Sequence, residues 1–260
     1  MSKRLSPIAV LATVGIAVAM FVSGCTPTPA PTPTPTTTSP PVTSPSATPT
    51  ATTPPTTPTA SPTAAGCAPT TATMPAGAIP RTTIDVDGDG LADTEWVTTT
   101  PSLEFGVTTA SGATYSFPLS TAAPTARVGF IARLNDHRIV ALTDDNRSAS
   151  VHFFVSCGWV TTKDSHGNQF PLDYNDFAST GSGVGCSLGY VVQFQATMTG
   201  STYTVTKRPL NLNATGSFAS FGPPVTVGTG LAASDSRVTV AQSLTCESVT
   251  VANGGVTVSE

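Results

Sequence analysis

The chain has 260 residues, a formal net charge of −4 and only 10% charged residues. Once residues 1–24 are set aside, nine basic residues stand against 15 acidic ones, a net charge of −6. No basic patch appears, which argues against a nucleic-acid partner.

The N-terminus has the pattern of a secretory signal peptide, which we place at residues 1–24. Lys3 and Arg4 precede an apolar run over 7–22, and small residues follow it. The run is shorter than the roughly 20 residues that a membrane span needs. Val22-Ser23-Gly24-Cys25 resembles the bacterial lipobox, in which the cysteine becomes the lipidated first residue. The sequence thus predicts a lipid anchor at Cys25, on the extracellular side of the cell membrane; an ordinary cysteine within the signal segment is the alternative.

Residues 26–65 are rich in proline and threonine. They contain 13 Pro and 16 Thr in 40 residues, with no charged or aromatic side chain. Such a segment has almost nothing to bury and cannot offset its ordering entropy. Proline favours extended chain at about 3.1 Å per residue, so the segment could reach roughly 120 Å. We therefore predict that residues 25–65 form a lipidated, disordered stalk.

The remaining residues, 66–260, amount to one domain. Short runs of valine, threonine, tyrosine and phenylalanine alternate with period two, which is typical of strands. Turn signals such as Ser111-Gly112 separate them. We expect an all-β domain of short antiparallel strands. The predicted strands cover 94–99, 103–108, 114–119, 138–142, 150–155, 190–195, 202–207, 225–227 and 237–241.

Four cysteines remain in this domain besides Cys25. In an exported chain they suggest two disulfides, for which three connectivities are possible. Cys157 and Cys186 bracket a loop-rich stretch, whereas Cys67 and Cys246 stand near opposite ends of the domain. We predict the pairs Cys157–Cys186 and Cys67–Cys246, with free buried thiols as the alternative.

A weak internal repeat emerges when the turns are aligned. The three units cover about 85–119, 134–172 and 185–210. The first two share a Phe-Pro-Leu ending, and the third matches mainly by its order of strands. Chance similarity among turn-rich β segments is the alternative.

The most distinctive stretch is Asp-Val-Asp-Gly-Asp-Gly-Leu-Ala-Asp, which begins at residue 85. Asp85, Asp87, Asp89 and Asp93 stand at its positions 1, 3, 5 and 9. Carboxylates this close repel one another, so a counter-ion would relieve the loop. Alternating spacing turns the first three toward one centre, and the intervening glycines permit a tight backbone path.

Calcium suits this set better than magnesium does. It accepts six to eight oxygen ligands in irregular geometry, and the Leu91 carbonyl at position 7 would supply one of them. An EF-hand would require a glutamate at position 12, where this chain has Trp96, and the flanks are strand-like. We predict a calcium site in a β-turn; a solvated acidic turn without metal is the alternative.

The motif Asp-x-Asp-Gly-Asp-Gly-x-x-Asp followed by a strand resembles the calcium loop of FG-GAP/VCBS-type repeats, found in integrin-like β-propellers and many bacterial surface proteins. The order of lipobox, Pro/Thr stalk and repeats also resembles actinobacterial lipoproteins of that kind. The resemblance makes Asp85, Asp87, Asp89 and Asp93 side-chain ligands, with Leu91 binding through its carbonyl. Because three units are too few for a closed propeller, it implies a partial β-propeller-like or sandwich domain.

No convincing catalytic group emerges from the sequence. Gly181-Ser182-Gly183 lacks the spacing of a nucleophile elbow, so we expect a flexible loop there. His152 is expected to face solvent from a strand. His137 and His166 are isolated in sequence. Paired carboxylates could come from Asp164, Asp173 and Asp176, although surface charge on loops is the commoner meaning of such residues.

The sequence therefore favours a lipid-anchored, calcium-containing envelope module that binds or adheres to an extracellular protein or glycan. An envelope hydrolase acting on wall glycan or protein is the alternative from a different class.

Overall fold

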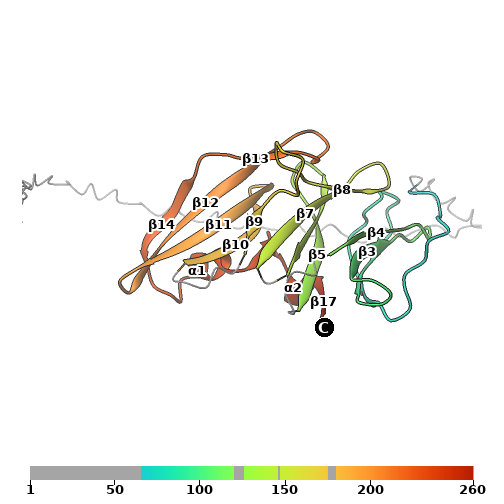
Figure 1. The fold of residues 1–260 in the computed structure, drawn as a ribbon, viewed down its shortest axis with the longest axis horizontal. Helices are drawn as coiled ribbons and strands as arrows, with labels where there is room; N and C mark the ends of the chain where they lie inside the picture. The colour runs from blue at the N-terminus through green and yellow to red at the C-terminus, as the bar shows by residue number, and fades with distance from the viewer. Residues whose placement is uncertain (1–65, 120–125, 146, 175–179, 260) are drawn as a thin grey trace, which may run out of the picture. The chain divides into compact units, whose positions relative to one another are not determined.

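The computed structural model describes residues 66–119, 126–145, 147–174 and 180–259. Within these residues the chain forms three β-sheets and two short helices (Figure 1). The predicted all-β class is confirmed. The signal segment, Cys25, the Pro/Thr stalk and Asp176 lie outside the described residues.

The first sheet is an antiparallel meander in the order β1-β2-β3-β4. Its bounds are β1 Ile79–Thr82, β2 Thr94–Thr98, β3 Glu104–Thr108 and β4 Thr114–Pro118. The acidic loop joins β1 to β2, and the Ser-Gly turn joins β3 to β4. The first repeat unit predicted from the sequence therefore lies mainly in this sheet.

The second sheet has the order β17-β5-β6-β7-β8, and β9 also pairs with β7. The C-terminal strand β17 thus joins a sheet that the middle of the chain builds. The bounds are β5 Arg127–Arg133, β6 Ile139–Asp144, β7 Ser148–Phe154, β8 Trp159–Thr161, β9 Leu172–Asp173 and β17 Gly255–Val258.

The third sheet has the order β13-β12-β11-β10-β15-β16, and β14 pairs with β12. A parallel pair joins β10 to β15 across a connection that contains helix α1. The bounds are β10 Thr180–Ser187, β11 Tyr190–Thr199, β12 Thr202–Leu212, β13 Ala219–Phe221, β14 Val225–Leu231, α1 Ser236–Ala241, β15 Leu244–Cys246, β16 Val249–Thr250 and α2 Val251–Gly254.

Hydrophobic clusters join these elements into layers. Phe105 and Val107 of the first sheet pack with Ile131 of the second. On the other face of the second sheet, Phe130 and Phe153 pack with residues of the third sheet. A further cluster joins the third sheet to α1. Full burial of each such side chain contributes about 1.5–3 kcal/mol. The result is a layered, sandwich-like fold with the second sheet in the middle.

Two of the predicted elements are wrong. The segment 237–241 is helical, because Asp235 caps α1 through the Arg237 backbone N–H and because Val238 and Ala241 turn to the core at helical spacing. Gly181-Ser182-Gly183 lies within strand β10 and not in a loop. Its glycines suit a close neighbour: a Cβ at Gly183 would stand 2.6 Å from the Ser243 carbonyl oxygen.

The predicted disulfide pairing is also wrong, although all four cysteines are oxidised as expected. The bonds join Cys67 to Cys157 and Cys186 to Cys246. Cys186 and Cys246 stand opposite each other on the parallel strands β10 and β15, with Cα atoms 4.3 Å apart. Pairing thus follows from which strands are neighbours, and the reasoning from positions along the chain missed that parallel contact.

His152 does not face solvent as predicted. It is buried on β7, its ring stacks on Phe117 with centroids 3.6 Å apart, and its Nδ1 lies 3.2 Å from the Thr161 hydroxyl. The first sheet covers this face of β7, so alternation along the strand does not separate core from solvent here. Burial lowers the pKa of His152 to about 3.

Among the described residues, no helix is both long enough and apolar enough to cross a membrane.

The His152 environment predicts acid lability. Because its folded-state pKa lies below the usual value of 6.5, the unfolded chain binds the proton more readily, so stability is lost as pH falls from about 6.5 toward 3. Between about pH 6.5 and pH 4, we expect the free energy of unfolding to fall by about 3 kcal/mol more in the wild type than in His152→Gln. Urea titrations across this range measure the difference. His166→Gln, at an exposed histidine, is the control, and parallel curves for all three proteins would contradict the prediction.

Candidate metal-binding loop

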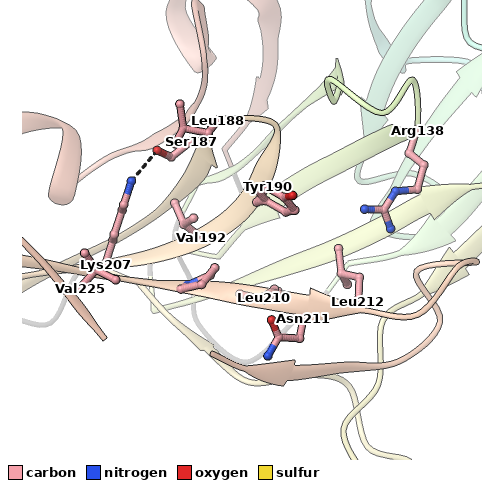
Figure 2. Close-up of a pocket in the computed structure, with 11 residues that line it drawn as sticks. Arg138, Ser187, Leu188, Tyr190, Val192, Lys207, Leu210, Asn211, Leu212 and Val225 are labelled. Carbon is pink, nitrogen blue, oxygen red and sulfur yellow. Dashed lines mark hydrogen bonds between the residues drawn. The ribbon is translucent and has the colours of Figure 1, made fainter. Parts of the chain in front are cut away.

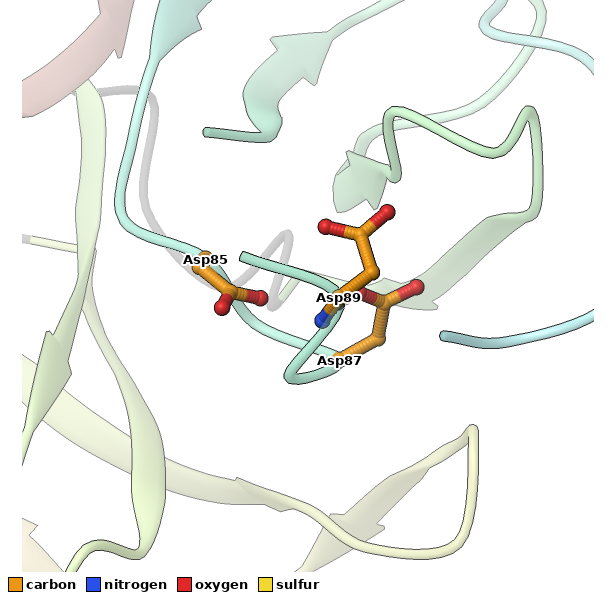
Figure 3. A group of neighbouring side chains, drawn as sticks. All are labelled: Asp85, Asp87 and Asp89. Carbon is orange, nitrogen blue, oxygen red and sulfur yellow. Dashed lines mark hydrogen bonds between the residues drawn. The ribbon is translucent and has the colours of Figure 1, made fainter. Parts of the chain in front are cut away.

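The acidic loop runs from β1 to β2 over a tight backbone path. Gly88 and Gly90 have φ values of +81° and +85°, a region that side chains with a Cβ rarely adopt. These glycines let the chain double back, so that alternate aspartates face one another. Figure 3 shows Asp85, Asp87 and Asp89 around the loop.

The three aspartates each offer an oxygen within 4.8 Å of the others. Backbone amides of the same loop hold them there. Asp85 accepts hydrogen bonds from the N–H groups of Gly88 at 2.7 Å and Gly90 at 3.0 Å, and Asp89 accepts one from Leu91 at 2.7 Å. The loop's own backbone therefore holds Asp85 and Asp89, and the grouping of the three matches the inward alternation that the sequence predicts.

Asp93 is placed differently from the other three. It is buried, and its two oxygens accept hydrogen bonds from the Val86 N–H at 2.7 Å and the Ala110 N–H at 2.9 Å. Burial raises its pKa, the two amides oppose that shift, and the nearby charges of Asp87 and Asp85 add to it. Asp93 thus ties the loop to the β3–β4 turn, and it does not belong to the group of three.

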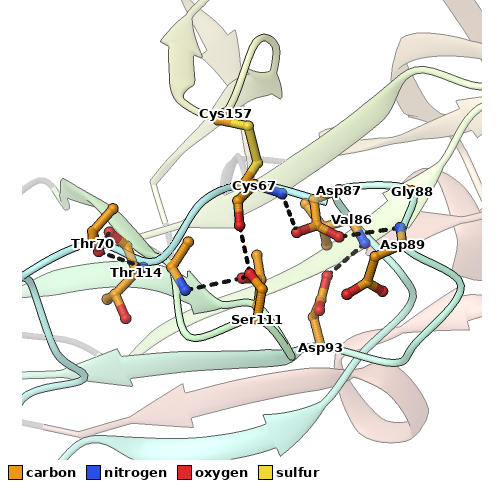
Figure 4. The surroundings of a disulfide bond; sticks show 12 residues. Cys67, Thr70, Val86, Asp87, Gly88, Asp89, Asp93, Ser111, Thr114 and Cys157 are labelled. Carbon is orange, nitrogen blue, oxygen red and sulfur yellow. Dashed lines mark hydrogen bonds between the residues drawn. A yellow bond between two sulfur atoms is a disulfide. The ribbon is translucent and has the colours of Figure 1, made fainter. Parts of the chain in front are cut away.

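The loop is also attached to a disulfide. The Cys67 backbone N–H donates to Asp87 Oδ2 at 2.8 Å, and the Cys67 carbonyl accepts from the Ser111 hydroxyl at 2.6 Å (Figure 4). Cys67 is bonded in turn to Cys157 in the β7–β8 turn. Sequence reasoning missed this contact, because 20 residues separate Cys67 from Asp87. The disulfide therefore holds one of the three carboxylates in place.

The donor set fits a hard cation. Three carboxylates supply oxygen only, and calcium prefers oxygen ligands. Within the part of the chain that the structure describes, none of the three forms an ion pair with a lysine, arginine or histidine. The Leu91 side chain is exposed, and coordination by its carbonyl stays a prediction.

Glu95 follows the loop on β2, and its side chain lies in the interface between the first two sheets. It is fully buried, and its Oε2 accepts from the Ile131 N–H at 2.8 Å. Its Oε1 has no hydrogen-bond partner among the described residues. Burial raises the pKa of Glu95 to about 8, against the opposing effects of Ile131, Thr83 and Arg81. A buried acid of this kind could not be found from the alternation of β2 alone.

The residues considered for catalysis are dispersed. His137 lies in the turn between β5 and β6, and Ser182 is buried within β10. Asp164 accepts backbone hydrogen bonds from His166 and Asn168, which lowers its pKa, and it lies 3.7 Å from the His166 ring. Asp173 is exposed on β9. The structure brings no histidine to Ser182 among the contacts that it describes.

Comparison of the chain with known protein families, with curated proteins and with solved structures finds no match.

The position of Asp93 predicts that it matters for stability. Asp93→Asn keeps one acceptor but turns an amide group toward a backbone N–H, so one buried hydrogen bond is lost. We expect a loss of about 1–3 kcal/mol in the free energy of unfolding, measured by urea titration with a chelator present. Asp173→Asn, at an exposed position, is the matched control. Equal stability of the two variants would show that the Val86 and Ala110 contacts contribute little.

Proposed function

We propose that this protein is a lipid-anchored module of the cell envelope, stabilised by calcium and displayed on a stalk to bind or adhere to an extracellular protein or glycan. The observation that carries the proposal is the group formed by Asp85, Asp87 and Asp89. Its resemblance to the calcium loops of FG-GAP/VCBS-type repeats supports the choice of ion and the surface role.

Features of export support the location. The signal-like N-terminus ends at Cys25, where a lipobox would place the lipid, and a Pro/Thr-rich segment follows it. Two disulfides in the domain suit an oxidising compartment. Extracellular calcium modules commonly have dissociation constants of roughly 10⁻⁴–10⁻³ M, so a site of modest affinity would be filled outside the cell.

Calcium should raise the stability of the folded domain. The unfolded chain has no preformed site, so binding stabilises the native state by RT ln(1 + [Ca²⁺]/Kd), which is about 1.4 kcal/mol at ten times Kd. Asp89→Asn should remove most of this gain, because one carboxylate charge disappears. The substituted amide still offers an oxygen to the Leu91 N–H. Without calcium, the variant should be at least as stable as the wild type, because repulsion in the loop falls. Thermal unfolding with calcium, with magnesium and with chelator measures these effects.

The control for this experiment is Asp173→Asn, which should keep the full calcium response. If millimolar calcium does not change the melting temperature and calorimetry detects no binding, the loop is an acidic turn without a metal site.

The lipid anchor has its own test. Cys25→Ser should yield protein that is unlipidated and either released or retained as the precursor, because the thiol that accepts the lipid is missing. Membrane fractionation and mass spectrometry of both proteins provide the measurement, with Ser23→Ala as a control that keeps the cysteine. Unchanged mass and fractionation of Cys25→Ser would remove the anchor from the proposal.

A further inference from the structure

A groove lies between strands of the third sheet and the β5–β6 turn of the second, where Arg138 lines it. Its volume is about 530 Å³, and its apolar lining includes Val192 on β11 and Leu210 and Leu212 on β12. Three exposed apolar side chains also line it: Leu188 at 77%, Tyr190 at 56% and Val225 at 48% exposure. Pockets of roughly 300–1,000 Å³ with mostly apolar walls are typical small-molecule sites.

Among the described residues, two cations line the groove and no acidic residue does. Figure 2 shows Lys207 and Arg138 at opposite ends of it, with Tyr190 and Val192 between them. This is unusual in a domain whose acidic residues outnumber its basic ones. The groove therefore suits an anion better than the surrounding surface does.

Lys207 is the cation with the greater capacity for a ligand. Its side chain is half-buried, and its ammonium donates to the Ser187 hydroxyl at 2.9 Å. Within the described residues it forms no ion pair, so further N–H donors remain for a ligand. Arg138 is already engaged: its Nε lies 2.7 Å from Asp136, and its guanidinium stacks 5.1 Å from the Phe153 ring centroid.

The turn that carries Leu188 is costly for the fold. Leu188 and Gly189 form the two-residue loop between β10 and β11, with φ values of +54° and +81°. Such a type I′ turn favours Asn-Gly, and a leucine in the left-handed region is strained. The chain therefore keeps an exposed, strained apolar side chain at the edge of the groove, where a ligand could cover it.

We propose that the groove binds a small organic acid, in which a carboxylate or a similar anionic group pairs with Lys207 and an apolar body lies on Val192, Leu210 and Leu212. Leu188 and Tyr190 close over that body. The inference goes beyond the proposed function, and it depends neither on calcium nor on the lipid anchor.

Anilinonaphthalene sulfonate, a fluorescent anion with an apolar body, tests the groove on the full-length protein. We expect saturable binding that Lys207→Gln weakens about tenfold, because a charge-assisted contact is lost. Leu188→Asn should weaken binding while the melting temperature is unchanged or higher, because asparagine suits the turn. Lys163→Gln, at an exposed lysine outside the groove, should bind as the wild type does. Octanoate should displace the probe, and octanol should do so poorly.

The proposal would be overturned if neither Lys207→Gln nor Leu188→Asn changed the affinity for the probe, or if octanol displaced the probe as well as octanoate does. A dimer in sedimentation experiments that Leu188→Asn dissociates would also overturn it, because it would assign the groove to a second copy of the chain. Titrations in calcium and in chelator separate the two proposals. If the groove binds the acid and calcium does not change the stability of the domain, this inference stands and the calcium proposal is wrong.

Discussion

The acidic loop depends on one electrostatic constraint: three carboxylates stand within 4.8 Å of one another. At about that distance two unit charges repel by about 1 kcal/mol in water and by about 3 kcal/mol at an effective dielectric constant near 20. Backbone N–H groups offset part of this cost, through Gly88 and Gly90 for Asp85 and through Leu91 for Asp89. A bound cation would offset the rest.

The surrounding fold attaches the loop to the sheets through contacts outside the loop itself. Asp93 ties it to the β3–β4 turn, and Asp87 is held by Cys67, whose disulfide reaches the second sheet at Cys157. Apolar packing between Phe105 and Ile131 joins the same two sheets. The loop is therefore attached to the β-layers at several independent points, so the geometry of its carboxylates does not rest on the short loop alone.

Local patterns predicted much of this structure. Period-two alternation correctly predicted β2, β3, β4 and β11. The spacing of the aspartates correctly predicted that Asp85, Asp87 and Asp89 lie close together. Contacts between distant segments could not be predicted from local sequence patterns. A Val-Thr-Val run reads as a strand, yet the Asp235 cap and the cover that α1 gives the third sheet make it helical. His152 alternates correctly, but its sheet is covered on both faces. The Cys186–Cys246 disulfide follows the parallel β10–β15 pairing, which no local pattern reveals.

The central claim is that a disulfide-held loop binds calcium, and calorimetric titration of two disulfide variants tests it most directly. Cys67→Ala/Cys157→Ala frees the segment whose N–H holds Asp87, whereas Cys186→Ala/Cys246→Ala cuts a bond in the third sheet. Under conditions in which circular dichroism shows both variants folded, the first should bind calcium at least about fivefold more weakly than the wild type, a cost of about 1 kcal/mol. The second should bind within about twofold of the wild type, a difference of less than about 0.5 kcal/mol. Equal calcium affinity of the two variants, or a wild-type protein without a calcium heat signal, would contradict the account.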